Sequence, residues 1–381
     1  MAAVNSIKAS NYDHKSDGVL PEDASVRVLL SPLNKYLQRE GATELCVNAP
    51  GAVFVEIEAT FERFEAPELT MSYLMGLVTA ISHFATQGIN AETPIMSATL
   101  PDGERIQIII PPALEQGSIC LCIRVPSKQV FSLGAYRQKG YFDRYLWAES
   151  KDEQNLYEML NFGDKTLLQL MRDKEIEEFL VQAVKLKKTI AVVGDTGSGK
   201  TTFMKTLCQQ ISCSERLVTI EDVRELFLDK HDNRVHLLYS KGGQGLAKVT
   251  PADLISGCMR LNPSRVLLAE LRGSEAFDFL KLLLSGHAGS ITSYHAESCA
   301  LAAERYVLMC KEHPQAGIYS GDELKRVFAL TVDILIHVEA RVIEDDEGNP
   351  VAKDRYIAEI SYDPIAKLES RFGNSEVRRA S

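Results

Sequence analysis

The pattern of apolar and polar positions changes character near the middle of the chain. Between residues 25 and 148, short apolar runs are separated by turn residues such as Pro50-Gly51 and Pro101-Asp102-Gly103, a pattern typical of antiparallel strands. From residue 173 to 370, apolar runs of strand length alternate with segments of helical periodicity, which is typical of a mostly parallel sheet. The pattern therefore predicts an α/β protein in which a smaller α+β domain at 25–148 precedes a larger domain at 173–370.

Two helices and several strands are predicted in the smaller domain. The helix after Thr70 has the spacing of one buried face, and its apolar positions are Tyr73, Leu74, Leu77, Val78 and Ile81. An earlier helix is predicted through Val28, Leu29, Leu33 and Leu37. The predicted strands are Cys46-Val47, 53–57, 95–100, 104–110 and 118–125. Residues 1–24 are polar and mixed, so they are predicted to form a flexible arm.

The larger domain begins after a charged and aromatic segment that we interpret as a linker at 149–172. Its first predicted helix has apolar positions at Ile176, Phe179, Leu180, Ala183 and Val184. The β-branched run Thr189 to Val193 then predicts a buried strand. The acidic segment Glu344 to Asn349 is interpreted as a solvated hairpin turn, and residues 371–381 as a frayed tail.

Length and composition support two folded domains and narrow the possible classes of protein. The 381 residues exceed one ordinary core, and 45% hydrophobic with 25% charged residues is typical of globular proteins. Met1 to Lys15 contain no apolar signal segment, and no apolar run is long enough to span a membrane. The eight cysteines include no C-x-x-C pair, so the sequence predicts neither a zinc site nor a disulfide framework and favours a reducing cytosol.

The net charge of −10 argues against nucleic-acid binding as the main activity. Acidic residues outnumber basic residues on both sides of residue 150, so neither half forms a basic lobe. A protein that neutralises many phosphates needs a local excess of lysine and arginine. Direct binding of nucleic acid is therefore not expected.

A glycine-rich segment after the predicted strand at 189–193 carries the clearest chemical signal. It reads Gly194-Asp195-Thr196-Gly197-Ser198-Gly199-Lys200-Thr201-Thr202, and Lys200 begins a predicted helix. In this strand, loop and helix context, the pattern predicts that backbone N–H groups surround a phosphate. Lys200 is expected to reach the β- and γ-phosphates of ATP, and the Thr201 hydroxyl to coordinate Mg²⁺.

Carboxylates at two predicted strand ends are candidates for holding the metal and orienting water. Glu221-Asp222 follows the apolar run at 217–220, and Glu270 follows the run at 266–269. Both should emerge at the carboxyl edge of the sheet, where ligands bind in this type of fold. A carboxylate there can orient water for attack on the γ-phosphorus or hold the ion. The sequence thus nominates Glu270 and Glu221, whereas Asp222 is explained equally well as a surface acid.

Two histidines, His287 and His295, flank a further strand-like segment. They could be metal ligands, but a zinc site normally needs a third spaced ligand, which this segment does not offer. An imidazole at the end of the strand that faces a phosphate or a neighbouring subunit is the better interpretation.

These segments together resemble a known family. The resemblance is to the Walker A, Asp box, Walker B and His box of the secretion superfamily of hexameric ATPases, in the same order and spacing. The matching segments are the phosphate loop, Thr219 to Asp222, Arg265 to Gly273 and Gly286 to His295. One departure is Ala269, which stands where many members of the superfamily have glycine before the acid.

The smaller domain narrows the resemblance to the traffic ATPases of type IV secretion systems. Leu100 to Arg105, Pro111-Pro112 and Ile123 to Ser127 look like signatures of the first domain of that branch. The likeness covers 25–340 and implies that the larger domain is a RecA-like P-loop NTPase domain. It also implies a homohexamer with ATP bound between the two domains of each chain.

The resemblance assigns roles to residues outside the phosphate loop. Glu270 would act at Mg²⁺ and the catalytic water, Glu221 would assist, and His295 would sense the γ-phosphate. Arg105 and Arg124 would reach the nucleotide from the amino-terminal domain, a task suited to a guanidinium group that is always charged.

Two more arginines, Arg260 and Arg265, flank Leu261 to Ser264 and could equally serve a neighbouring subunit. The resemblance also implies a cytoplasmic protein, peripheral on the cytoplasmic face of the bacterial inner membrane. Other secretion ATPases and inner-membrane channel components would be its partners.

Three further hypotheses remain open from the sequence. The first is a motor for type II secretion or for type IV pilus assembly and retraction, and the absence of a four-cysteine zinc element argues against it. The second is a nucleic-acid-stimulated RecA-like motor, which the lack of a basic lobe disfavours. The third is a scaffold that binds ATP without useful turnover, and only a rate measurement separates it from the ATPase.

Overall fold

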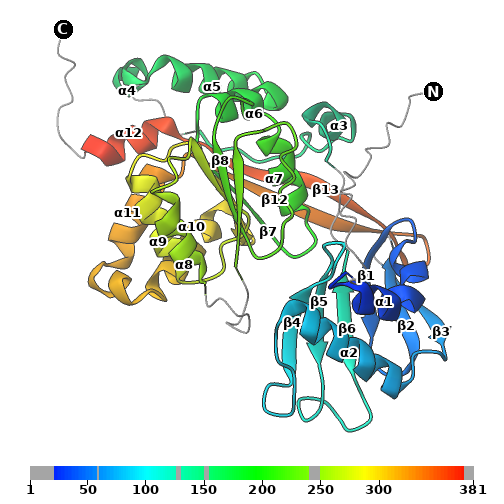
Figure 1. Cartoon of the computed structure of the whole chain (residues 1–381). Helices are drawn as coiled ribbons and strands as arrows, with labels where there is room; N and C mark the ends of the chain where they lie inside the picture. Colours follow the sequence, from blue (N-terminus) through cyan, green and yellow to red (C-terminus); the bar gives the residue numbers. More distant parts are fainter. Residues whose placement is uncertain (1–20, 58–59, 126–129, 150–153, 240–248, 373–381) are drawn as a thin grey trace.

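The computed structural model describes residues 21–57, 60–125, 130–149, 154–239 and 249–372 (Figure 1). The predicted arm and tail lie mostly outside these ranges. The described residues form two sheets, one antiparallel and one mostly parallel, which confirms the predicted fold class. None of the helices in the described ranges has the length and apolar character needed to cross a bilayer.

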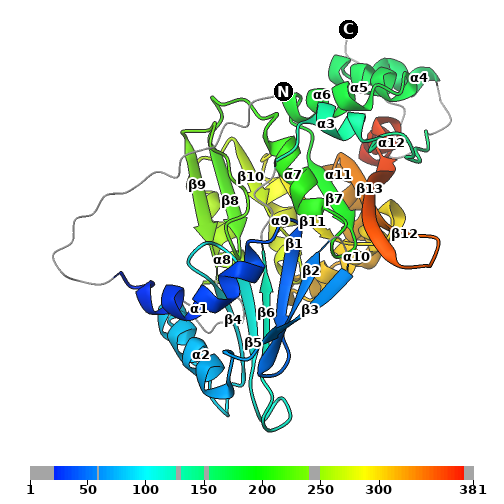
Figure 2. The same ribbon diagram turned by 90° about the vertical axis from the view of Figure 1, so that its right-hand side faces the viewer.

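The smaller sheet has six strands in the order β3-β2-β1-β6-β5-β4, all antiparallel to their neighbours. They are β1 (Ala42–Val47), β2 (Gly51–Ile57), β3 (Thr60–Ala66), β4 (Ile95–Thr99), β5 (Arg105–Ile109) and β6 (Cys120–Arg124). Figure 2 shows α1 (Ala24–Leu37) and α2 (Met71–Ala85) together on one side of this sheet. Every second residue of β1 and β6 is buried under them, so the other face of these strands carries the more polar side chains.

The two helices begin and pack as local chemistry dictates. Thr70 starts α2, because its hydroxyl accepts a hydrogen bond from the backbone N–H of Tyr73 at 3.2 Å. The predicted apolar face of α2 is confirmed by its buried residues Leu74, Leu77, Val78 and Ile81. In α1 the prediction was wrong for Val28, which is 68% exposed. The buried positions of α1 have a helical spacing that begins two residues before Val28, at Val26, Leu30, Leu33 and Tyr36.

The segment that we predicted as a linker, 149–172, contains helices over most of its length. Here the structure has α4 (Gln154–Met159) and α5 (Phe162–Arg172), preceded by α3 (Leu133–Gln138). The side chains of Leu167, Leu168 and Met171 in α5 are buried in the same apolar cluster as the larger sheet. The polar residues that suggested a linker lie only just before α4. Leu167, Leu168 and Met171 have the spacing of a helix instead.

The larger sheet has seven strands in the order β13-β12-β7-β11-β10-β8-β9, and only β13 is antiparallel to its neighbour. They are β7 (Ile190–Gly194), β8 (Leu217–Glu221), β9 (Arg234–Leu238), β10 (Arg265–Leu268), β11 (Ile291–His295), β12 (Ile334–Glu344) and β13 (Pro350–Ser361). The remaining elements are α6 (Ile176–Lys185), α7 (Lys200–Cys208), α8 (Pro251–Cys258), α9 (Glu275–Leu284), α10 (Cys299–Lys311), the 3₁₀ helix η2 (Pro314–Ile318), α11 (Gly321–Thr331) and α12 (Pro364–Phe372).

Helices cover both faces of the larger sheet, which explains why its central strands are continuous apolar runs. On β7, Ile190 and Val192 pack in a cluster with α3, α5, α6 and α7. Ala191 and Val193 point to the opposite side and pack with α8, α9, α10 and α11. The predicted buried strand and the predicted apolar face of α6 are both confirmed.

The long hairpin of β12 and β13 reaches from the larger sheet to the smaller one (Figure 1). Near its turn, the backbone carbonyl of Pro350 accepts a hydrogen bond from the Thr60 hydroxyl at 3.0 Å. Lys353 pairs with Glu56 of β2 at 2.8 Å. The acidic turn itself is exposed, as predicted, so the contact with the amino-terminal domain is made by the strand that follows it.

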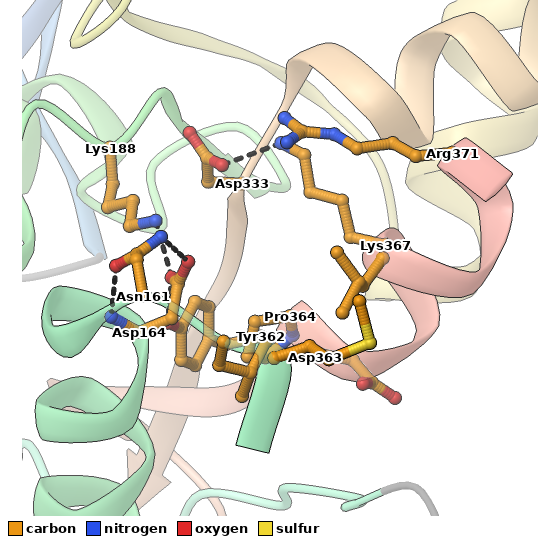
Figure 3. Close-up of a pocket in the computed structure, with 12 residues that line it drawn as sticks. Asn161, Asp164, Lys188, Asp333, Tyr362, Asp363, Pro364, Lys367 and Arg371 are labelled. Carbon is orange, nitrogen blue, oxygen red and sulfur yellow. Dashed lines mark hydrogen bonds and ion pairs between the residues drawn. The ribbon is translucent and has the colours of Figure 1, made fainter. Parts of the chain in front are cut away.

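A cavity of about 230 Å³ lies at the amino ends of β7 and β12, between α5 and α12 (Figure 3). Four of its charged groups form two ion pairs: Lys188 lies 2.5 Å from Asp164, and Lys367 lies 2.6 Å from Asp333. The hydroxyl of Tyr362 donates to Asp164 at 2.7 Å. Ligands bind at the carboxyl ends of parallel strands, so this cavity lies at the wrong edge of the sheet for the nucleotide and its polar groups tie α5 and α12 to the domain.

Candidate active site

The phosphate loop has the strand, loop and helix context that the sequence predicted. It leaves β7 at Gly194 and enters α7 at Lys200, with Gly199 at the helix N-cap in the left-handed region at φ 94°. A Cβ atom on Gly194 would lie 2.2 Å from the carbonyl oxygen of Val338, so only glycine fits beside β12. The loop therefore lies at the positive end of α7, where backbone N–H groups favour an anion.

Lys200 folds back onto this loop. Its ammonium group donates to the carbonyl oxygens of Gly194 and Asp195, at 2.9 and 2.7 Å. Burial lowers the pKa of Lys200 to about 8, against the opposing effects of Glu270 and Asp195. A negative group close to this ammonium would relieve the cost of burying its charge, which is the electrostatic setting expected of a phosphate-binding lysine.

The other loop residues fit a nucleotide phosphate. The hydroxyl of Ser198 is buried and has no hydrogen-bond partner in the described part of the chain. Thr201 and Thr202 lie in the first turn of α7, and the backbone N–H of Thr196 donates to the Asp195 side chain. A glycine-rich loop, an unsatisfied hydroxyl and a desolvated lysine match the binding of triphosphate, and a threonine beside the lysine is a suitable oxygen ligand for Mg²⁺.

The structure brings His295 between the phosphate loop and Glu270. Its Nδ1 lies 3.3 Å from the Lys200 ammonium, and its Nε2 lies 3.1 Å from Oε1 of Glu270. An ammonium group has only donors, so Nδ1 accepts and Nε2–H donates to Glu270. Strand β11 is hydrogen-bonded to both β7 and β10, which is why its last residue falls between the ends of those strands.

Beyond Glu270, alternating charges continue to the amino-terminal domain. Arg272 lies 2.5 Å from Oε2 of Glu270 and 3.5 Å from Asp222. Asp222 also pairs with Arg105 of β5 at 2.8 Å, and Arg105 contacts Glu225 at 2.7 Å. These residues follow the strand order β10 and β8 and then cross between the domains. Sequence analysis named Asp222 without favouring it and overlooked Arg272, although its place two residues after Glu270 was a usable signal.

Glu221 lies deeper in the protein than the residues of this series. Its side chain is buried, and one oxygen accepts from the backbone N–H groups of Glu225 and Leu226, both at 2.8 Å. The other oxygen accepts from the Thr219 hydroxyl at 2.8 Å and lies 3.5 Å from His236. These partners belong to β8, β9 and the loop after β8, so Glu221 fixes the loop that carries the carboxylates contacting the amino-terminal domain.

Two arginines approach the phosphate loop from outside the parallel core. Arg124, exposed at the end of β6, is close enough to contribute to the lowering of the Lys200 pKa. Arg355 of β13 donates from Nε to the carbonyl oxygen of Gly197 at 3.2 Å. Sequence analysis missed Arg355, because no motif surrounds it and only the pairing of β13 with β12 brings it to the loop.

The structure also places the two remaining arginines and the two histidines that the sequence singled out. Arg265, considered for service to a neighbouring subunit, is 1% exposed, and its guanidinium pairs with Glu215 at 2.8 Å. That buried ion pair commits Arg265 to its own chain, whereas Arg260 is exposed. His295 is the last residue of β11 and His287 lies before that strand, and in the described ranges they do not join a group of three metal ligands.

Comparisons with known proteins agree with this geometry. The family described as "Type II/IV secretion system protein" matches residues 159–329. The type IV secretion system protein VirB11 of Brucella suis is 42% identical over 371 residues, covering 95% of this chain and 99% of that protein. This chain belongs to the VirB11 family of type IV secretion ATPases. The family implies that it binds ATP and is a component of a secretion system.

Two more relatives extend the comparison. The type IV secretion system protein PtlH of Bordetella pertussis is 39% identical over 327 residues, covering 86% of this chain and 94% of that protein. The crystal structure of the Brucella suis VirB11 ATPase in complex with sulphate is 42% identical, covers 92% of this chain and 98% of its own, and has a TM-score of 0.50. The pilus retraction motor PilT with bound ADP, at 14% identity and a TM-score of 0.52, shares the fold alone.

Proposed function

We propose that this chain is a Mg²⁺-dependent ATP hydrolase that works as a homohexamer and powers pilus assembly or substrate translocation in a type IV secretion system. The series Lys200, His295, Glu270 carries the proposal, since it joins the phosphate-binding lysine to an acid at the carboxyl edge of the sheet. Membership of the VirB11 family supports the cellular role. The proposed location is the cytoplasmic face of the inner membrane, with other secretion ATPases and inner-membrane channel components as partners.

The loop from Gly194 to Thr202 is proposed to bind the phosphates of ATP. The ammonium of Lys200 is held by two loop carbonyls and is already desolvated. Exchanging these carbonyls for phosphate oxygens requires little movement of the lysine and little further loss of hydration. Such preorganised positive charge stabilises the phosphoryl oxygens as they gain charge during transfer.

Glu270 is proposed to act next to the γ-phosphate, on the metal or on the attacking water. Mg²⁺, held by Thr201 and Glu270, would neutralise the charge that develops between the β- and γ-phosphoryl oxygens. The imidazole of His295 and the guanidinium of Arg272 each bind one oxygen of Glu270, so they fix the direction of the carboxylate. A carboxylate fixed in this way can hold a water in line with the phosphorus.

Arg105, Arg124 and Glu221 are proposed to link the chemistry to the domain arrangement. Arg105 is engaged with Asp222 and Glu225, so its proposed role is to dock the amino-terminal domain over the site. Arg124 is exposed on the next strand of that domain and is the better candidate to approach the nucleotide directly. Glu221 is proposed to act indirectly, by holding the backbone of the loop that follows β8.

The test compares phosphate release from ATP and Mg²⁺ by the parent, by Lys200→Ala and by the control Lys185→Ala. Lys185 is exposed at the end of α6, so its variant should retain the parental rate. Lys200→Ala should lose both ATP binding and phosphate release. Equal rates in all three proteins would remove the enzymatic proposal, and a strict monomer by mass measurement with ATP and Mg²⁺ would contradict the hexamer.

A further inference from the structure

Two strands from opposite halves of the smaller sheet bring two cysteines together. Cys46 of β1 is directly opposite Cys122 of β6 in the antiparallel register. Their neighbours along each strand are buried in the core under α1 and α2, so both thiols lie on the opposite face of the sheet. Glu44, two residues before Cys46, lies on that same face.

The backbone pattern brings these side chains especially close. The N–H of Val125 donates to the carbonyl oxygen of Thr43 at 3.0 Å, so this pair is hydrogen-bonded and Cys46 with Cys122 is a non-hydrogen-bonded pair. In such pairs the Cα atoms are only about 4.5 Å apart and the side chains approach closely. The two Sγ atoms lie 3.7 Å apart, and the Cys122 thiol donates to the Glu44 carboxylate at 2.6 Å.

The distance between the sulfur atoms matches a shared metal ion. In a tetrahedral zinc site with Zn–S bonds of about 2.3 Å, two thiolate sulfurs lie about 3.8 Å apart. One ligand atom from each of Glu44, Cys46 and Cys122 lies within 4.8 Å of the other two. All three residues are partly exposed, so an ion can enter from solvent and a water can complete its coordination.

Charge explains why an ion would be held there. Ionising both thiols next to a carboxylate would gather three negative charges on one small surface, which is unfavourable without a cation. A divalent cation that binds thiolate removes this repulsion as the two thiol protons leave to solvent.

We propose that Glu44, Cys46 and Cys122 form a binding site for a thiophilic divalent cation, with Zn²⁺ as the reference ion. The site joins β1 to β6, the seam between the β1–β3 and β4–β6 halves of the smaller sheet. A bound ion would therefore fasten two halves that are distant in sequence. The sequence did not predict this site, because its two cysteines are 76 residues apart and form no C-x-x-C pair.

The experiment uses the full chain, reduced and stripped of metal, without nucleotide or Mg²⁺. Zn²⁺ is titrated against a chromophoric chelator, and Co²⁺ is added separately to detect thiolate-to-cobalt charge transfer and the visible bands of tetrahedral cobalt. The parent and Cys213→Ser should each take up a single ion with these bands, since Cys213 is exposed elsewhere in the chain. Cys46→Ser and Cys122→Ser should lose the charge-transfer bands, and Glu44→Gln should weaken zinc uptake.

A second measurement needs no variant and so does not depend on how the substitutions fold. Iodoacetamide labelling of the parent, analysed by peptide mass spectrometry, should be slowed by Zn²⁺ at Cys46 and Cys122 and unchanged at Cys213. Equal labelling with and without Zn²⁺, or cobalt spectra without thiolate bands, overturns the proposal. A disulfide between Cys46 and Cys122 in protein purified without reductant, with no zinc uptake after reduction, overturns it as well.

Discussion

The Nε2 atom of His295 lies 3.1 Å from Oε1 of Glu270, although the two residues come from the ends of different strands. The strand order explains the contact, because β11 lies between β7, which leads into the phosphate loop, and β10, which leads to Glu270. The order of polar residues from Lys200 to Asp222 follows the order of the strands themselves. We therefore expect a change at the phosphates to pass along this sheet edge toward the amino-terminal domain.

His295→Ala is expected to bind ATP nearly as well as the parent but to hydrolyse it more slowly. The substitution removes one hydrogen bond to the Glu270 carboxylate, and such bonds to charged groups contribute about 1.5–3 kcal/mol, or about 10- to 150-fold in rate. Steady-state phosphate release beside nucleotide titration measures the two effects. An unchanged rate would show that His295 does not position the acid, and His287→Ala, before the start of β11, serves as the control.

ATP affinity is expected to depend on pH through Lys200. Its pKa is about 8 without nucleotide because of burial, and phosphate favours the charged form, so binding raises the pKa and takes up protons. Affinity should be nearly constant below about pH 8 and should fall above it by up to about tenfold per pH unit. Calorimetry in buffers of different ionisation enthalpy measures the proton uptake. Lys200→Arg, which stays charged, should lack this dependence, and a parental affinity independent of pH up to 10 would refute it.

Glu221→Ala is expected to destabilise the larger domain before it affects the chemistry directly. It leaves two backbone N–H groups without their acceptor, at about 1–3 kcal/mol each, so the free energy of unfolding should fall by about 2–6 kcal/mol. The single tryptophan, Trp147, packs against the apolar cluster of this domain, so its fluorescence reports the unfolding. The exposed Glu178→Ala is the control, and equal stability of the two variants would contradict the structural role.

The pair of Arg105 and Asp222 is expected to couple the two domains. A double-mutant cycle with Arg105→Ala and Asp222→Ala should give non-additive effects on ATP hydrolysis, with a coupling of about 0.5–3 kcal/mol. Arg63→Ala, in an exposed pair on β3, should leave the rate unchanged. Strictly additive losses of ATP hydrolysis would mean that this contact does not couple the two domains.

The sequence predicted the parts of the site that local chemistry determines. Gly194 to Thr201 has a pattern that only a strand, loop and helix satisfy, and the apolar runs before Glu221 and Glu270 set both acids at the carboxyl edge of the sheet. These elements depend on residues close together in the chain. Their predicted catalytic roles stay predictions until rates are measured.

The features that the sequence did not predict depend on pairing between distant segments. Arg355 reaches the phosphate loop only because β13 pairs with β12, and Cys46 meets Cys122 only because β1 pairs with β6. Arg265 follows the same rule, since its burial beside Glu215 results from the packing of β10 and the residues before β8. The spacing of residues within a single strand or helix does not predict such contacts.

Glu270 is the residue on which the proposed chemistry depends most. The most direct measurement compares Glu270→Gln with the parent for ATP binding and for phosphate release in the same preparation. The amide keeps the size of the side chain but removes the charge that is proposed to hold Mg²⁺ or orient water. We expect ATP binding to persist and phosphate release to fall by at least about 100-fold. A Glu270→Gln protein that releases phosphate at the parental rate would contradict the proposed site.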